Sequence, residues 1–228
     1  MASKVKTDDI YYPKSFWLFL VDSPFNRKLR SGFYYLISEN VKFSPRQKVL
    51  DLGVTDKDYN YFHKLYPFKE NITAAGLASE NIYIERDYPE IRYVQIKPNF
   101  PYLFKDKSFD FIHSSSVIEH VGSKLRQQEF LIDLNRIGKS GVITTPNRWY
   151  PLEFHTMLLF VHWLPTKIYR KIFKLLGFEA SADEKHLNLL SFKEFDLLAK
   201  RANFKEYKIV SKRSFGFISN YLLFWYDK

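Results

Sequence analysis

The chain has 228 residues, of which 46% are hydrophobic and 18% aromatic. This is enough apolar material for one full core but too little length for two such domains, so we expect a single domain over residues 1–228. The chain contains no cysteine, which excludes disulfides and thiolate metal sites. A reducing compartment fits this composition, and we expect a cytoplasmic location.

The formal net charge is +10 at pH 7. Such an excess attracts phosphate-bearing partners or an anionic membrane surface, although lysines that solvate the surface explain it equally well. There is no zinc-finger spacing, aromatic RNP run or arginine-dense block, so we do not expect a nucleic-acid partner. The longest apolar stretch, residues 154–164, contains two histidines and is followed by Pro165. It is too short to predict a membrane span.

In chain order, residues 1–44 come first and are aromatic and basic. We expect one or two helices there, ahead of a sheet. Short apolar runs of strand length follow at residues 48–53, 72–77, 91–96, 109–113 and 141–145. Segments with helical spacing separate these runs, most clearly residues 125–137. Alternating strands and helices predict a parallel sheet covered on both faces.

The C-terminal part has a different pattern. Ser191 and Glu194 form a capping-box sequence, which predicts the start of a helix that ends near Asn203. Two strand-like runs, residues 207–211 and 221–225, are close enough in sequence to form an antiparallel hairpin at a sheet edge.

Residues 149–190 form an insertion between the sheet and this tail. Within residues 154–178, tryptophan, leucine and phenylalanine alternate with basic side chains, and a helix from Thr166 would carry an apolar and a basic face. Such a helix can lie on an anionic membrane or cover a substrate site as a lid. It can equally pack on the domain with its lysines in water.

Four short motifs follow the predicted strands in order: Val49-Leu-Asp-Leu-Gly53, Ser108-Phe-Asp-Phe-Ile112, Val117-Ile-Glu-His-Val121 and Ile143-Thr-Thr-Pro-Asn147. This series resembles the class I S-adenosylmethionine-dependent methyltransferases, in particular the type-11 group, over about residues 48–148. The resemblance implies a Rossmann-like α/β fold with a seven-stranded, mostly parallel sheet whose last strand is antiparallel. It places the cofactor at the carboxyl ends of the first strands.

The resemblance implies cofactor contacts at six positions, namely Asp51, Gly53, Thr55, Ala78, Glu80 and Ser115. Several of them depart from the family pattern. Thr55 and Lys57 replace the second and third glycines of the first loop. The acid that usually binds the ribose hydroxyls is replaced by Ala78, with Glu80 the nearest carboxylate, and the aspartate that usually receives the adenine amino group is replaced by Lys97. We therefore expect S-adenosylmethionine to bind weakly or not at all.

Polar residues that could carry chemistry follow the fourth and fifth predicted strands. We predict His120 as a general base oriented by Glu119, although a capping glutamate and a packed histidine are an equal alternative. Asn147, Glu153 and His155 lie on the same predicted edge and are candidate substrate contacts. They could join Glu119 and His120 around a divalent metal, but no fixed ligand spacing supports this, so no metal site is predicted. His186 and Asn188 are expected to be structural.

Two functions remain open. The first is an S-adenosylmethionine-dependent O-methyltransferase of a small molecule, sugar or lipid-linked glycan, with peripheral membrane contact through residues 154–178. The second is a degenerate methyltransferase-fold protein that binds another ligand or a protein partner. The altered cofactor loop is the feature that separates them.

Overall fold

A seven-stranded sheet forms the centre of the computed structural model, which describes residues 24–55 and 61–227. The strand order is β3-β2-β1-β4-β5-β7-β6, with β1 to β5 parallel and β7 antiparallel to both neighbours. The strands are β1 Val49–Leu52, β2 Ile72–Gly76, β3 Arg92–Gln95, β4 Phe111–Ser115, β5 Ser140–Pro146, β6 Glu206–Ser214 and β7 Phe217–Tyr226. The expected mostly parallel sheet with an antiparallel last strand is confirmed.

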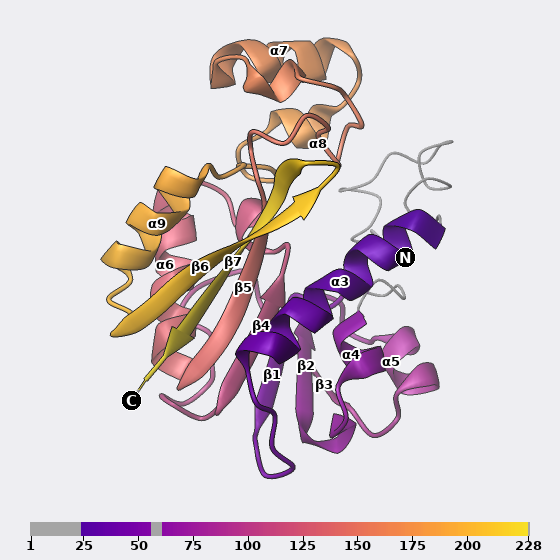
Figure 1. The fold of residues 1–228 in the computed structure, drawn as a ribbon, viewed down its shortest axis with the longest axis vertical. Coiled ribbons are helices and arrows are strands. Elements are labelled where there is room, and N and C mark those ends of the chain that lie inside the picture. The colour runs from indigo at the N-terminus through magenta and orange to yellow at the C-terminus, as the bar shows by residue number, and fades with distance from the viewer. Residues whose placement is uncertain (1–23, 56–60, 228) are drawn as a thin grey trace.

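Helices cover both faces of this sheet (Figure 1). The helices are α3 Pro24–Asn40, α4 Tyr61–Leu65, α5 Ile82–Asp87, α6 Lys124–Ile137, α7 Thr166–Leu175, α8 Glu179–Ala182 and α9 Phe192–Arg201, and the 3-10 turns are η1 Lys69–Asn71, η2 Ile118–His120 and η3 Val161–Trp163. One hydrophobic core joins alternate strand residues to α6 and α9, and the other joins the intervening strand residues to α3, α4 and α5.

The local signals in the sequence explain several element boundaries. The side chain of Ser123 accepts from the Arg126 amide at the start of α6, and the expected capping box of Ser191 and Glu194 opens α9. Both satisfy amides that a helix leaves unpaired at its first turn. Of the expected N-terminal helical segment, α3 is described from residue 24 onward; residues 1–23 lie outside the described part.

The β6–β7 hairpin is longer than the two apolar runs indicated. Strand β6 has mostly part-exposed and exposed residues because it lies at the edge of the sheet, and the pairing is irregular between Lys212 and Arg213. A strand that contacts the core on one side does not need a continuous apolar run.

The insertion after β5 holds η3, α7 and α8. Figure 1 shows α7 at one end of the molecule, with α8 between it and the sheet. The chain enters this region from the carboxyl end of β5, so the insertion stands over the edge of the sheet where open α/β folds bind ligands. Within the described residues, no helix is long and apolar enough to cross a bilayer.

Candidate functional site

The candidate site is built from two loops at the carboxyl edge of the sheet. The loop after β4 contains η2, which carries Glu119 and His120, and the loop after β5 carries Glu153 and His155. Because β4 and β5 are parallel neighbours, their following loops emerge on the same edge. The fold therefore brings together residues that are more than thirty positions apart in sequence.

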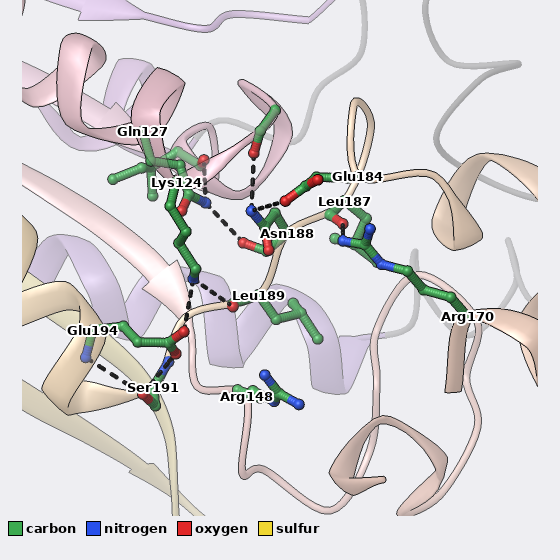
Figure 2. Close-up of polar contacts among 12 residues, drawn as sticks. Lys124, Gln127, Arg148, Arg170, Glu184, Leu187, Asn188, Leu189, Ser191 and Glu194 are labelled. Atoms are coloured by element: carbon green, nitrogen blue, oxygen red, sulfur yellow. Dashed lines mark hydrogen bonds and ion pairs between the residues drawn. The ribbon is translucent and has the colours of Figure 1, made fainter. Parts of the chain in front are cut away.

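A third segment, residues 184–194, fixes the position of η2. The backbone amide of Asn188 donates to the Glu119 carbonyl at 2.7 Å. The Gln127 side chain donates to the carbonyls of Ile118 and Asn188, at 3.0 and 2.8 Å. Lys124 and Glu194 form an ion pair at 3.0 Å that joins the starts of α6 and α9 (Figure 2). This network is structural, as expected for Asn188, and it holds the backbone that carries Glu119.

Two histidines face each other in the centre of the site. The Nε2 atoms of His120 and His155 are 3.2 Å apart. Nδ1 of His120 lies 2.7 Å from the His186 carbonyl, and Nδ1 of His155 lies 2.6 Å from Glu153 Oε1. Because both of these partners are hydrogen-bond acceptors, each Nδ1 carries the proton and donates.

The Glu153 carboxylate binds the backbone of the turn that follows it as well as the His155 side chain. Its Oε2 accepts from the amide and the hydroxyl of Thr156, both at 2.7 Å, and its Oε1 also accepts from the His155 amide at 3.0 Å. Burial alone would raise the pKa of Glu153, but His155 and these donors lower it to about 2. In turn, burial would lower the pKa of His155, and Glu153 raises it above its ordinary value. The expected substrate contact Glu153 is thus buried as a partner of His155.

Glu119 is fully buried beside this pair. Its Oε2 accepts from the Thr145 hydroxyl at 3.1 Å, whereas Oε1 has no hydrogen-bond partner among the described residues. Burial raises the pKa of Glu119 to about 7. Burial and the neighbouring His155 lower the pKa of His120 to about 3, which makes His120 a weak proton acceptor at neutral pH. A base role for His120 alone therefore receives no support from its surroundings.

Three of the expected site residues form a group that could hold a metal ion. One side-chain ligand atom from each of Glu119, His120 and His155 lies within 4.8 Å of the others. Asn147 does not join this group. Its amide donates to the Ile218 carbonyl at 2.8 Å and accepts from the Trp149 amide at 3.0 Å, so it fixes the junction between β5 and β7. In this structure Asn147 is a turn residue, and its role as a substrate contact stays a prediction.

Asp51, one of the expected cofactor contacts, directs its carboxylate to two histidines. Its two carboxylate oxygens bind His113 Nδ1 and His63 Nε2, each at 2.6 Å, and all three side chains are buried. Side chains alternate along a strand, so Asp51 shares the face of Val49, which packs towards α3, α4 and α5. Although burial acts in the opposite direction, the two imidazoles hold the pKa of Asp51 well below its usual range.

The first loop also differs from the expected cofactor cradle. Gly53 has a φ of +94°, and a Cβ there would overlap the Val117 side chain. Glycine at this position therefore allows Val117 to pack closely. The Thr55 carbonyl accepts from the Asn81 side chain at 2.9 Å. Lys57, which replaces a family glycine, lies outside the described residues.

Tyr93 of β3 is hydrogen-bonded to the loop after β2. The Tyr93 hydroxyl donates to the Ala78 carbonyl at 2.8 Å. The Ser115 hydroxyl pairs with Thr144 at 2.9 Å, while Glu80 and Lys97 are exposed. At the two places where the family uses carboxylates for ribose and adenine, the structure offers backbone groups and one exposed lysine.

Sequence reasoning missed His63, His113 and Tyr93. A signal existed for the first two, because Asp51 falls on a buried strand face and a buried carboxylate needs partners. His113 has the same parity as Phe111 on the neighbouring strand, directly opposite Asp51. No local pattern indicated Tyr93.

Comparison with known proteins defines the fold class. No protein-family model matches the chain, and a search of curated proteins found no match. Among solved structures, the chain is similar to a protein from Pyrococcus horikoshii OT3 (TM-score 0.57, 16% identity, 91% of this chain and 93% of that one). It is also similar to an S-adenosylmethionine-dependent methyltransferase from Aquifex aeolicus (TM-score 0.55, 15% identity, 90% and 94%).

A third similar structure is the N-terminal domain of EvdMO1, studied with S-adenosylhomocysteine and D-fucose (TM-score 0.54, 12% identity, 87% and 83%). At these identities the similarity concerns the fold. Together with the strand order, it shows that the chain has the Rossmann-like fold of class I methyltransferases, as the motif series implied.

Proposed function

We propose that the chain is an S-adenosylmethionine-dependent O-methyltransferase that acts on a hydroxyl group of a small molecule, sugar or lipid-linked glycan. The observation that carries this proposal is the cluster of Glu119, His120 and His155 at the carboxyl ends of β4 and β5. In this fold that edge is where ligands bind. The similar N-terminal domain of EvdMO1 was studied in the presence of S-adenosylhomocysteine and D-fucose, and this supports a sugar hydroxyl as the acceptor.

S-adenosylmethionine would supply the methyl group. For its binding, the first loop offers backbone groups around Gly53 and Thr55, the loop after β2 offers those of Ala78, and the end of β4 offers those of Ser115. The charged acceptors for ribose and adenine are absent at Ala78 and Lys97, although Glu80 is exposed nearby. Each missing charge-assisted hydrogen bond costs about 1.5–3 kcal/mol, so the fit supports weak binding.

The chain's own contribution is to align the acceptor and to manage its proton. Holding an acceptor oxygen in line with a methyl donor removes much of the entropic barrier of a two-substrate reaction. His120 is part-exposed, whereas Glu119 and His155 are buried, so an acceptor would reach the cluster from the side of His120. The paired imidazoles and the carboxylate act as a unit in this proposal.

The second candidate is a methyltransferase-fold protein that no longer methylates and binds another ligand or a protein partner. The packing of Val117 against Gly53 favours this candidate, because the glycine serves an internal contact rather than an open loop. The loss of acceptor side chains at Ala78 and Lys97 points the same way. Binding of the cofactor by the wild-type protein separates the two candidates.

We also propose peripheral contact with an anionic membrane, with the protein in the cytoplasm. Helix α7 buries Tyr169 and Phe173 but exposes Ile168 and Leu175, the latter by 85%. Exposed lysines at positions 167, 171 and 174 lie on the same helix. Apolar side chains beside lysines suit the boundary between lipid headgroups and acyl chains.

The enzymatic proposal is tested by methyl transfer itself. The protein is incubated with methyl-labelled S-adenosylmethionine and a panel of hydroxylated sugars and small molecules, and label in the acceptor is measured. We expect label in at least one hydroxyl acceptor, and its loss in the His155→Ala variant. The Lys193→Ala variant, altered at an exposed position on α9, is the matched control. Absence of transfer together with absence of cofactor binding would favour the second candidate.

A further inference from the structure

We propose that Glu119, His120 and His155 form a binding site for one divalent transition-metal ion, with Nε2 of each histidine and a carboxylate oxygen of Glu119 as ligands. The side-chain ligand atoms of these three residues already lie within 4.8 Å of one another. The binding itself does not depend on methyl transfer, so it can be true or false independently of the proposed function.

The orientation of the two imidazoles is the first argument. Each histidine donates its Nδ1 proton to a fixed acceptor, His120 to the His186 carbonyl and His155 to Glu153. When both rings are neutral, each Nε2 presents a lone pair, and the two Nε2 atoms face each other. Metal-binding histidines are oriented in the same way, with the second ring nitrogen bound to a carboxylate or a backbone carbonyl.

The distance between the two nitrogens is the second argument. Ligand nitrogens about 2.0–2.1 Å from a tetrahedral ion lie about 3.3–3.4 Å apart. The observed Nε2–Nε2 distance of 3.2 Å is close to this value. Without a cation between or beside them, two facing lone pairs repel each other, and one proton would have to be shared. A shared proton is thus the competing explanation.

The third argument is a buried carboxylate oxygen of Glu119 that lacks a hydrogen bond within the described part of the chain. Its carboxylate is fully buried, Oε2 is occupied by Thr145, and Oε1 has no hydrogen-bond partner among the described residues. Buried carboxylate oxygens are normally hydrogen-bonded or bound to a metal. A cation held by the facing histidines would satisfy this oxygen.

The surrounding contacts make the site rigid. Glu153 is held by the amide and hydroxyl of Thr156, so the Glu153–His155 pair forms a fixed carboxylate–histidine unit. The backbone of Glu119 is fixed by the Asn188 amide. Partners of this kind commonly change metal affinity by about 10- to 100-fold when they are removed.

The ligand set selects the class of metal. Two imidazoles and one carboxylate match ions such as Zn²⁺ and Mn²⁺ better than Mg²⁺ or Ca²⁺, which prefer all-oxygen sites. Three protein ligands leave a coordination position open, and His120 is part-exposed whereas the other two ligands are buried. If the proposed function holds, an acceptor hydroxyl could take this position and lose its proton more easily.

The test is metal titration of the full-length protein after treatment with a chelator. ZnCl₂, MnCl₂ and, for comparison, MgCl₂ are titrated by calorimetry, and bound metal after equilibrium dialysis is counted per chain. We expect one ion per chain, with affinity reduced at least about tenfold in Glu119→Gln and in His155→Ala. Glu153→Gln should weaken binding less, because it removes an orienting partner and no ligand.

The matched control is His162→Gln. His162 is buried in the same insertion and donates to the Tyr150 carbonyl, which glutamine can also do. It lies outside the proposed ligand set and should bind metal as the wild type does. Circular dichroism of each variant shows whether it folds. For variants that do not fold, the visible d–d spectrum of Co²⁺ bound to the wild type reports directly on nitrogen and oxygen ligation.

Absence of a stoichiometric ion in the wild type would overturn the proposal and leave the shared proton as the explanation. Equal binding by the wild type and both ligand variants would overturn it as well, because the ion would then be held elsewhere. Binding of Mg²⁺ in preference to Zn²⁺ and Mn²⁺ would contradict the assigned ligand set.

Discussion

At the scale of single residues, Asp51 shows how a motif residue can be used for stability. Its carboxylate is buried between His63 and His113, with both oxygens occupied. Removing one partner of a buried ion pair leaves the other charge buried without compensation, which typically destabilises a protein by about 3–5 kcal/mol. Asp51, which the motif predicted as a cofactor contact, thus joins α4 to the sheet through His63.

This interaction predicts a specific pH dependence. Because the folded-state pKa of Asp51 lies below its ordinary value, its contribution to stability is fully present above the unfolded pKa of about 3.9. It is lost as the pH falls towards the folded value. Urea unfolding at pH 3 to 7 should show wild type more stable than Asp51→Asn near neutrality, with the difference shrinking below about pH 4. A difference that stays constant over this range would contradict this account.

Gly53 leads to a second residue-scale prediction. Gly53→Ala should destabilise the protein by about 1–3 kcal/mol, since its φ is positive and the new methyl group overlaps Val117. In the double variant with Val117→Ala, the loss of stability caused by the overlap should disappear, whereas the loss caused by the positive φ should remain. Thermal melts of the single and double variants measure both parts. If the double variant is no more stable than Gly53→Ala, then Val117 is not the cause.

At the scale of elements, the buried strands were predictable and the edges of elements were not. The five parallel strands fall at the apolar runs, and β1, β2, β4 and β5 are mostly buried because helices cover both faces of the sheet, whereas β3 lies at its edge. The site loop after β5 could not be derived in the same way. Met157 and Phe160 adopt positive φ angles without glycine, so tertiary contacts impose a path that no turn signal marks. Within this loop, Glu153 accepts from the amide and from Nδ1 of His155 and so fixes the imidazole that faces His120.

Helix α7 gives the prediction that belongs to this scale. The wild-type protein should sediment with vesicles that contain anionic phospholipid, and less with neutral vesicles. A triple change of Lys167, Lys171 and Lys174 to glutamate should reduce that binding at least about tenfold, because each basic residue near the surface contributes about 1 kcal/mol. Lys193→Glu, on α9, is the control. Equal sedimentation of the triple variant and the control would mean that α7 is not the contact.

At the scale of the whole molecule, the order of motifs predicted the fold and the edge of the sheet that carries the polar residues. The sequence alone could not show which of those residues meet. Asn147 and His155 both follow β5, yet Asn147 fixes a turn and His155 reaches the loop after β4. The difference depends on side-chain directions, which periodicity does not determine.

The central claim is that this fold still binds S-adenosylmethionine, weakly and mainly through backbone groups. The most direct measurement is calorimetric titration of the wild type and of Ala78→Asp with Lys97→Asp, with Lys193→Asp as a control for added negative charge. We predict weak wild-type binding, unchanged in the control and at least about tenfold tighter in the double variant, because each restored charge-assisted bond contributes more than about 1.4 kcal/mol. Submicromolar binding by the wild type would contradict the account of these two positions, and binding by neither protein would contradict the methyltransferase proposal.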